Sequence, residues 1–200
     1  MSARSVVIVA TGGANIASLV HALERLGVRA APSADPATIG EASHVILPGV
    51  GAALDAMGRL RETGLDRVIT RLPQPILGIC LGMQLLFDAS DEGPTPCLGV
   101  LPGRVERLAA GPDRPVPHIG WNTLERCADS PLLEGLRAGD RAYFVHSYAA
   151  PVTDATIATT EYGATFSACV QRDRCFGVQF HPERSAAVGA RVLANFLGVR

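Results

Sequence analysis

Short apolar runs alternate with helix-like segments through the first half of the chain, and this alternation constrains the fold more than any other feature. The runs are rich in β-branched and aliphatic side chains: residues 5–10 (SVVIVA), 44–51 (HVILPGVG) and 75–80 (PILGIC). Runs of this length indicate buried strands, the second of them broken by Pro48. Helical segments follow the first and third strands: residues 16–26, which end at Gly27, and residues 81–87 (LGMQLLF). This order predicts a parallel sheet covered on both faces.

The second half of the chain has a different character. Turn residues separate six short strand-like runs: 99–108, 116–124, 141–150, 155–163, 166–173 and 175–180. Residues 185–199 return to helical spacing, residues 11–15 (TGGAN) indicate a turn, and the Pro- and Gly-rich segment 93–102 indicates a surface loop. We therefore expect one α/β domain. Its central sheet should be mixed but mostly parallel, flanked by helices, with an antiparallel β-rich portion.

Composition excludes several classes of protein. The chain has 200 residues, 48% of them hydrophobic and 18% charged, which suits a single folded domain. Its net charge of -1 gives no electrostatic reason to expect nucleic acid or an anionic membrane as the main partner. No apolar run reaches the length of a membrane span, and the first apolar run is too short for a signal peptide. The 5 cysteines form no CxxC pair, which fits the reducing cytoplasm better than a disulfide framework or a structural zinc site.

Cys80 is the first candidate for chemistry. It lies between Gly78 and Gly82 in the pattern G-x-nucleophile-x-G, with cysteine where the hydrolase elbow has serine. A nucleophile at a strand-to-helix turn needs a strained backbone, and glycines two residues away remove Cβ clashes on both sides. The following helix would turn its amino end toward the sulfur, and the N–H of Leu81 would serve an oxyanion hole. The competing interpretation is a buried core cysteine, and this pattern alone leaves both open.

A cysteine nucleophile requires a base, and His181 is the strongest candidate. Pro182 holds His181 in extended backbone at the end of a strand, and Glu183 could orient the imidazole. The three side chains would then form a Cys-His-Glu triad. The alternative is an ordinary surface turn. His21 and His44 lie in a helix and a strand, which favours structural roles.

A second glycine turn follows the second strand, in LPGVG (residues 47–51). Gly49 and Gly51 would let backbone N–H groups approach a substrate and supply the other half of an oxyanion hole. Two other interpretations fail. The turn does not complete the GxGxxG dinucleotide fingerprint, and no cysteine after Cys175 completes the zinc-deaminase pattern that His181-Pro182-Glu183 could begin.

Taken in chain order, these motifs resemble the class I (triad) glutamine amidotransferases. More narrowly, they resemble the glutaminase subunit of imidazole glycerol phosphate synthase, from histidine biosynthesis. The matching segments are GGANIASLVHAL, LPGVGAALDAM, LGICLGMQLLF, LGVLPGRV, PHIGWN, YFVHSY, GVQFHPERS and ANFL. Met83 and the GWN segment favour this subfamily over anthranilate and aminodeoxychorismate synthase partners, which usually carry His at the Met83 position. The resemblance spans most of the chain and implies one glutamine amidotransferase type 1 domain over residues 1–200.

The resemblance implies a set of residue roles. Catalysis is assigned to Cys80, His181 and Glu183. Oxyanion stabilisation is assigned to the N–H of Leu81 and to Val50 or Gly51. Substrate contacts are assigned to Gly49, Gln84, Ser147 and Tyr148. Cys80 would attack the side-chain amide of glutamine, and hydrolysis of the thioester would release glutamate. No metal or other cofactor is implied.

The resemblance also implies a partner. Ammonia would pass to a cyclase subunit with a (β/α)8-barrel fold in a heterodimer, and the cyclase would form imidazole glycerol phosphate and the purine-pathway by-product AICAR. Residues expected toward this partner are Trp121, Asn122, Tyr143 and Arg184, whereas Phe144 is expected in the core. His118 and His146 are expected to support the site or the interface rather than to catalyse. Arg184 stands where many relatives carry Lys in an interfacial ion pair, which changes the geometry.

Alternative functions and local departures accompany this assignment. The chain could serve another ammonia-using synthase, or it could be a non-catalytic regulatory relative; the intact triad argues against the latter. Relatives often carry an acidic-aromatic pair where this chain has Ala10 and Thr11. A glycine is common where this chain has Ala186 and Ala187. These departures bear on the interface and on loop geometry rather than on the triad.

Overall fold

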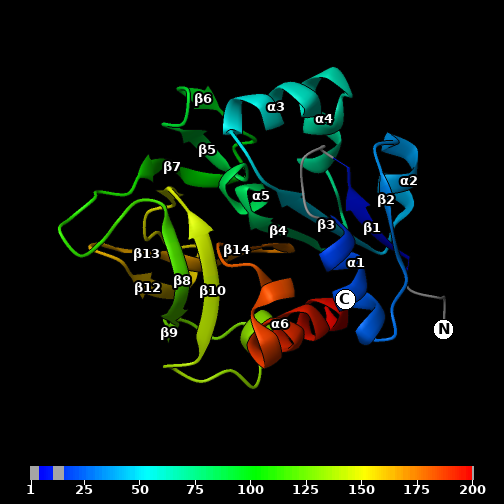
Figure 1. The fold of residues 1–200 in the computed structure, drawn as a ribbon. Helices are drawn as coiled ribbons and strands as arrows, with labels where there is room; N and C mark the ends of the chain where they lie inside the picture. The colour runs from blue at the N-terminus through cyan, green and yellow to red at the C-terminus, as the bar shows by residue number, and fades with distance from the viewer. Residues whose placement is uncertain (1–4, 11–15, 200) are drawn as a thin grey trace.

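A computed structural model describes residues 5–10 and 16–199, and within them eight strands form one central sheet (Figure 1). Neighbouring strands run parallel across β2 (Ala30–Ser33), β1 (Val6–Val9), β3 (His44–Gly49), β4 (Ile76–Cys80) and β14 (Cys175–Val178). The sheet continues antiparallel through β13 (Thr165–Arg172), β12 (Thr156–Glu161) and β9 (Glu125–Arg126). The predicted mixed, mostly parallel sheet is confirmed. The turn predicted at 11–15, together with Thr11, lies outside the described residues.

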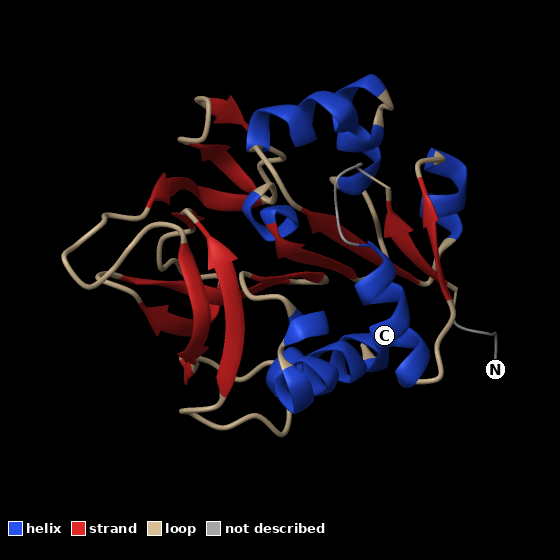
Figure 2. Ribbon diagram, viewed as in Figure 1, coloured by secondary structure: helices blue, strands red, loops and turns tan. Residues whose placement is uncertain are grey.

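Helices cover both faces of the parallel half (Figure 2). One face packs against α1 (Ile16–Arg25) and α6 (Ala186–Gly198), and the other packs against α2 (Pro36–Glu41), α3 (Ala53–Glu62) and α4 (Leu65–Ile69). Successive residues of a parallel strand point to opposite faces of the sheet, so their side chains pack alternately into the two hydrophobic cores. In β3, Ile46 belongs to the α1–α6 core, while Val45 and Leu47 belong to the other core. This double burial explains the nearly continuous apolar runs in the sequence.

Two smaller sheets flank the antiparallel half of the central sheet. In one, β8 (His118–Thr123) pairs with β10 (Arg141–His146). The other has the order β11 (Tyr148–Ala149), β7 (Leu101–Arg107), β5 (Phe87–Ser90) and β6 (Thr95–Pro96). Short helical turns occur at η1 (Pro131–Leu133) and η2 (Pro182–Arg184). None of the helices in the described part of the chain has the length and apolar character needed to cross a membrane.

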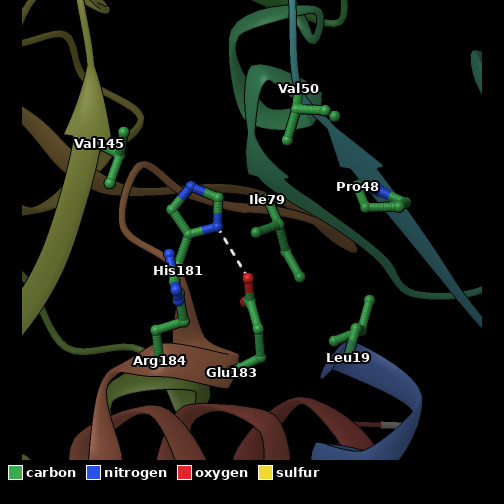
Figure 3. Close-up of a pocket in the computed structure, with 9 residues that line it drawn as sticks. Leu19, Pro48, Val50, Ile79, Val145, His181, Glu183 and Arg184 are labelled. Carbon is green, nitrogen blue, oxygen red and sulfur yellow. Dashed lines mark hydrogen bonds and ion pairs between the residues drawn. The ribbon is translucent and has the colours of Figure 1, made fainter. Parts of the chain in front are cut away.

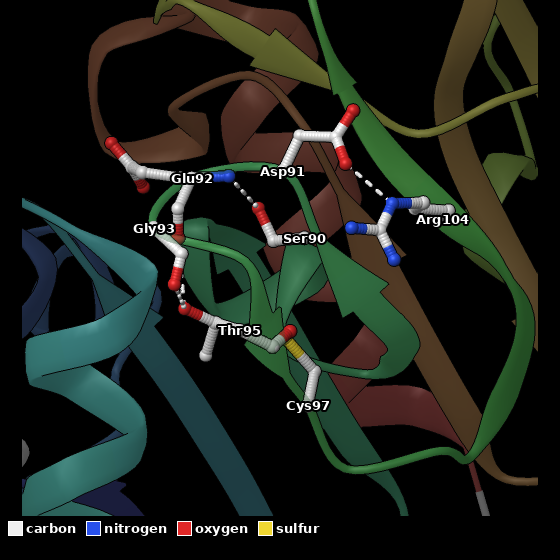
Figure 4. Close-up of polar contacts among 7 residues, drawn as sticks. All are labelled: Ser90, Asp91, Glu92, Gly93, Thr95, Cys97 and Arg104. Atoms are coloured by element: carbon white, nitrogen blue, oxygen red, sulfur yellow. Dashed lines mark hydrogen bonds and ion pairs between the residues drawn. The ribbon is translucent and has the colours of Figure 1, made fainter.

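The segment predicted as a surface loop, 93–102, is more ordered than expected. It contains β6 and the start of β7, and Thr95 is fully buried. Figure 4 shows the reason: the Thr95 hydroxyl donates to the carbonyls of Glu92 (2.8 Å) and Gly93 (3.1 Å), and Arg104 forms an ion pair with Asp91. Internal polar bonds and pairing with β5 therefore order a segment that still lies largely at the surface, as the Pro and Gly content suggested.

The predicted helix over 81–87 was too long. Only α5 (Leu81–Gln84) is helical, and β5 begins at Phe87. The carbonyls of Leu85 and Leu86, which a longer helix would use, instead accept the N–H groups of Leu98 and Val100 at 2.9 Å each. Because every residue of this segment is buried, hydrophobic periodicity could not mark where the helix ends.

Pro48 does not break β3, contrary to the sequence prediction. The strand extends through Gly49, and Pro48 pairs with Ile79 of β4. On the other side, the pairing of β3 with β1 ends at Ile46. The N–H that proline lacks is therefore not needed for the ladder with β1, and the strand tolerates Pro48 near its end.

Candidate active site

Cys80 occupies the end of β4, where the chain turns sharply into α5. Its backbone has φ 53° and ψ -112°, a conformation that non-glycine residues rarely adopt. The flanking glycines permit this turn. A Cβ at Gly78 would lie 2.7 Å from the carbonyl oxygen of Gly82, and a Cβ at Gly82 would lie 1.8 Å from the carbonyl oxygen of Leu47. The clash argument from the sequence is therefore confirmed, whereas the helix after the cysteine is a single turn.

The sulfur of Cys80 is buried and has two polar neighbours in addition to His181. Its Sγ lies 3.7 Å from the carbonyl oxygen of Val145 on β10, which a thiol S–H can approach as a donor. Nε2 of Gln179 donates to Sγ from 3.6 Å. The structure thus brings β10 and the residues after β14 to the end of β4.

His181 and Glu183 lie beside this turn, and η2 folds the glutamate back onto the histidine. Nδ1 of His181 lies 2.8 Å from Oε1 of Glu183, and only 13% and 8% of the two side chains are exposed (Figure 3). Backbone bonds fix the segment, because the His181 N–H donates to the carbonyl of Tyr143 at 2.9 Å and Ser185 Oγ donates to the carbonyl of His181 at 2.7 Å.

Opposing effects act on the His181 imidazole. Burial lowers the pKa of His181, but interaction with the Cys80 side chain and the hydrogen bond and charge of Glu183 raise it to about 10. An imidazolium at this position can pair with a thiolate and can donate a proton to a leaving group. Among the described residues, Oε2 of Glu183 is buried without a hydrogen-bond partner.

One cavity collects most of the residues that the sequence assigned to the site. Its lining includes Val50, Gly51, Cys80, Leu81, Gln84, Ser147, Tyr148 and His181. Figure 3 shows a neighbouring cavity, whose lining includes Gly49 and Glu183. Val50, Val145 and His181 line both cavities. Gly51 has φ +89°, which suits glycine in the turn that joins β3 to α3. The predicted residues therefore meet in space, although they come from distant parts of the chain.

Gln84 is buried, and the nitrogen of its side-chain amide already donates two hydrogen bonds within the protein. Nε2 donates to the carbonyl of Tyr148 at 2.7 Å and to Oε1 of Gln179 at 2.9 Å. An amide nitrogen has two hydrogens, so both are used and Oε1 of Gln84 is the atom free to accept from a ligand. The carbonyl of Ser147 is likewise engaged, since it accepts the Leu108 N–H at 2.9 Å.

The sequence analysis did not predict that Gln179 and Glu92 make contacts at or near the site. Gln179 contacts Cys80 and Gln84 as described above. Oε2 of Glu92 accepts the Ala53 N–H at 2.8 Å at the start of α3, where the preceding residue supplies no side-chain cap. This bond fastens the segment that follows the Pro48–Gly51 turn. A local pattern could not reveal either contact, because each joins residues far apart in sequence.

His118 and His146 form a buried pair, of which His146 lines the cavity around Cys80. Nδ1 of His118 lies 3.0 Å from Nε2 of His146, whose Nδ1 lies 2.8 Å from the carbonyl of Tyr148. Burial lowers the pKa of both histidines to about 4, so the pair is neutral at physiological pH. His44 lies elsewhere, against Phe196 of α6, with Nε2 3.0 Å from the carbonyl of Val199. The structural role expected for His44 is confirmed.

Three of the residues predicted to face a partner form a group next to His181: Trp121 and Arg184 are exposed, and Tyr143 between them is half-buried. Trp121 is 44% exposed, and its ring meets that of Tyr143 edge-on at a centroid distance of 6.0 Å. The Arg184 guanidinium lies 5.5 Å from the centre of the Tyr143 ring. Asn122 differs, because its side chain already bonds to the Glu161 carbonyl (2.8 Å) and to the Thr123 N–H (2.8 Å). Phe144 is fully buried, as predicted.

The described residues offer no grouping of three or more His, Cys, Asp or Glu side chains suited to a metal ion. The site instead offers the chemistry of the cysteine, the histidine, the glutamate and the surrounding amides. This arrangement can form and hydrolyse a covalent thioester.

Solved structures share this fold. A protein described as a glutamine amidotransferase superposes with a TM-score of 0.75 at 23% identity, covering 96% of this chain and 97% of that one. A putative GMP synthase protein from Thermoplasma acidophilum superposes with a TM-score of 0.74 at 19% identity, covering 99% and 94%. At these identities the likeness supports the fold.

Sequence comparison is more specific. The family model for class-I glutamine amidotransferases matches residues 7–198. The imidazole glycerol phosphate synthase subunit HisH of Xylella fastidiosa (strain Temecula1) is 53% identical over 192 residues, 96% of each chain. The protein of the same name from Xanthomonas campestris pv. campestris (strain 8004) is 54% identical over 186 residues, 93% of each chain. This chain belongs to the class-I glutamine amidotransferase family.

Proposed function

We propose that this chain is the glutaminase subunit of an imidazole glycerol phosphate synthase. The observation that carries the proposal is that Cys80 and His181 line one cavity and that Glu183 lies 2.8 Å from Nδ1 of the same His181. The HisH relatives, which match nearly the whole chain, support the assignment to imidazole glycerol phosphate synthase rather than to another synthase. We place the protein in the cytoplasm, where the proposed pathway and a free catalytic thiol belong.

The first half of the reaction forms a thioester. The Cys80 thiol passes its proton to His181, Sγ attacks the side-chain carbonyl carbon of glutamine, and the carbonyl oxygen becomes an oxyanion. The N–H groups of Leu81 and of Val50 or Gly51 stabilise that oxyanion. His181, oriented by Glu183, gives a proton to the departing nitrogen, so that ammonia leaves and a γ-glutamyl thioester remains.

The second half releases glutamate. His181, now neutral, accepts a proton from water, and the resulting hydroxide attacks the thioester carbonyl. The same backbone donors stabilise the second oxyanion. When the C–S bond breaks, the sulfur regains its proton from His181 and glutamate leaves.

Gly49, Gln84, Ser147 and Tyr148 hold the glutamine in this proposal. Gln84 contributes through Oε1, because its amide hydrogens are committed to Tyr148 and Gln179. The Ser147–Tyr148 segment contributes through N–H groups or the Ser147 hydroxyl, because both carbonyls already accept hydrogen bonds within the protein. A substrate that presents both donors and acceptors, as glutamine does, matches this set.

Ammonia is a nucleophile only while unprotonated, so it must reach its acceptor without entering bulk water. We propose that the cavity lined by Leu19, Pro48, Ile79 and Arg184 faces the partner, a (β/α)8-barrel cyclase. The group of Trp121, Tyr143 and Arg184 would anchor that partner. Asn122 would support the interface through its bond to β12 rather than by reaching outward. No cofactor is required on this subunit.

Replacement of the nucleophile tests the proposal. In the complex with its cyclase, Cys80→Ala should lower glutamine-dependent synthesis at least about 10³-fold, while synthesis from added ammonium salt should stay near the wild-type rate. Loss of both activities in a correctly assembled complex would contradict the proposal. The same assay with the acceptors of other ammonia-using synthases separates the histidine pathway from its relatives, since only the true acceptor should consume the ammonia.

A further inference from the structure

We infer that Gln179 is a further catalytic residue, whose side-chain amide donates a hydrogen bond to Cys80 Sγ and holds the sulfur during attack. This inference rests on the proposed function, because it assigns a role within the same reaction. Gln179 follows β14 and has no exposed surface, and its Nε2 lies 3.6 Å from Sγ. Its own N–H donates to the carbonyl of Ala168 on β13 at 2.9 Å, which fixes its backbone.

The neighbours of Gln179 determine which end of its amide faces the sulfur. The Tyr148 carbonyl can only accept, so Gln84 must turn Nε2 toward it. That nitrogen can only donate, so Gln179 must turn Oε1 toward Gln84. Nε2 of Gln179 is left to face Cys80. A single backbone carbonyl thus sets the direction of a chain of bonds that ends on the nucleophile.

This orientation matters when the thiol loses its proton. As a thiol, Cys80 can donate S–H to the Val145 carbonyl, 3.7 Å away. After the proton passes to His181, the sulfur can only accept, and the Val145 carbonyl no longer attracts it. The Gln179 N–H then remains as a neutral donor to a negatively charged acceptor, a type of bond that is stronger than one between neutral groups. Gln179 therefore favours the nucleophilic form and keeps it near the substrate.

A purely structural buried glutamine would look different, and the chain contains one for comparison. Gln74 is 9% exposed, and its Nε2 donates to the carbonyls of Ile39 and Gly40 at 3.0 and 3.3 Å. It contacts backbone only and lies away from the cavity around Cys80. Gln179, in contrast, bonds to the proposed nucleophile and to a proposed substrate residue. The pair of glutamines provides a matched control.

The test measures the rate at which iodoacetamide alkylates Cys80, located by peptide mass mapping, between pH 6 and 9. Gln179→Met keeps the side-chain length and removes the donor, and it should slow alkylation about tenfold and lower kcat for glutamine more than it raises KM. Gln74→Met loses buried hydrogen bonds of the same kind and should leave the alkylation rate within about twofold of wild type. Equal rates in the Gln179→Met and Gln74→Met variants would overturn the inference.

Gln179→Glu decides the question if Gln179→Met does not fold. Its carboxyl keeps an acceptor for Gln84, but it can donate to sulfur only when protonated. Its alkylation rate relative to wild type should therefore recover as the pH falls, an effect that a packing defect would not produce. A constant ratio across pH would reject the inference. Wild-type protein that fails to hydrolyse glutamine with its cyclase would refute the proposed function instead, so the two failures can be told apart.

Discussion

Cys80 adopts a backbone conformation that costs about 1–3 kcal/mol for a residue with a Cβ, and the surrounding structure must offset this cost. The neighbouring residues Leu81 and Met83 are almost completely buried, and the glycines of the turn let β3 and α5 approach closely. Strain of this kind presents the sulfur above the sheet, where His181 can reach it. The residue that carries the chemistry thus has a backbone conformation that non-glycine residues rarely adopt.

The charge of His181 should depend on the sulfur beside it. Burial lowers the pKa of His181, whereas interactions with Cys80 and then with Glu183 raise it to about 10. Cys80→Ala removes both the hydrogen bond and the charge interaction with Cys80 and leaves burial in place, so the pKa of His181 should fall. NMR titration of the His181 ring in the folded protein measures this directly.

Cys169→Ala is the control for that titration. Cys169 is fully buried in β13, and burial raises the pKa of its thiol, but it is not among the groups that shift His181. The His181 titration should therefore be unchanged in Cys169→Ala. If the pKa of His181 fell equally in both variants, the cause would be a general loosening of the core rather than the loss of the Cys80 sulfur.

At the scale of the elements, the sequence predicted most strands of the central sheet and both long helices that cover one face. One failure lies where burial is complete. The segment after Cys80 is buried throughout, so no polar face distinguishes the one-turn helix α5 from β5. The 93–102 segment failed for the opposite reason, because its Pro and Gly content hid the pairing of β6 with β5.

In the candidate site, too, some residues could be predicted from the sequence and others could not. Cys80 and the pair His181–Glu183 could be predicted because each has a local signature: glycines at fixed spacing, or a carboxylate two residues from a histidine. Gln179 and Glu92 have no such signature. Their bonds join residues 99 and 39 positions apart, and only the folded sheet brings those residues together.

The first residue of α6 offers a test of local strain. Ala186 has φ 48°, a backbone conformation that favours glycine, and its side chain is exposed. Ala186→Gly should raise the free energy of unfolding by about 0.5–1 kcal/mol, because glycine adopts this φ without a Cβ clash. Urea unfolding followed by circular dichroism measures the change.

Ala190→Gly is the matched control, since Ala190 is also exposed and lies inside the same helix. There glycine should lower the free energy of unfolding by about 0.5–1 kcal/mol through its poor helix propensity. If both substitutions destabilise alike, the positive φ of Ala186 imposes no measurable cost.

At the scale of the whole molecule, hydrogen bonds connect the less exposed side of β8, which carries His118 and Asn122, to the catalytic sulfur. From the Tyr148 carbonyl one arm runs through His146 and His118 to Asn122, and the other runs through Gln84 and Gln179 to Cys80. The carbonyl accepts from both arms and so fixes the direction of each. This arrangement requires a neutral histidine pair, because a second proton would put two donors face to face.

The stability of the molecule should therefore fall in mild acid. Burial lowers the pKa of His118 to about 4. The pKa of His146 is also lowered to about 4, and burial is the largest cause. The hydrogen bond to Tyr148 raises the pKa of His146, and the charges of His118 and His181 lower it further. An unfolded histidine has its ordinary value of about 6.5, so between these values the unfolded chain binds more protons than the folded one. The stability contributed by this pair should be fully retained above about pH 6.5 and should be lost as the pH falls from there through about 4, whereas the raised pKa of His181 acts in the opposite direction at alkaline pH.

Histidine substitutions separate this effect from the acid sensitivity of carboxylates. His118→Phe keeps the ring that stacks on Tyr162 at 4.0 Å but binds no proton, so the loss of stability between pH 7 and 4 should be smaller than in wild type. His21→Asn, at an exposed position of α1, should keep the wild-type loss. Urea unfolding at a series of pH values measures both. If His118→Phe loses as much stability as wild type over this range, the buried pair does not govern the acid response, and the carboxylates must account for it.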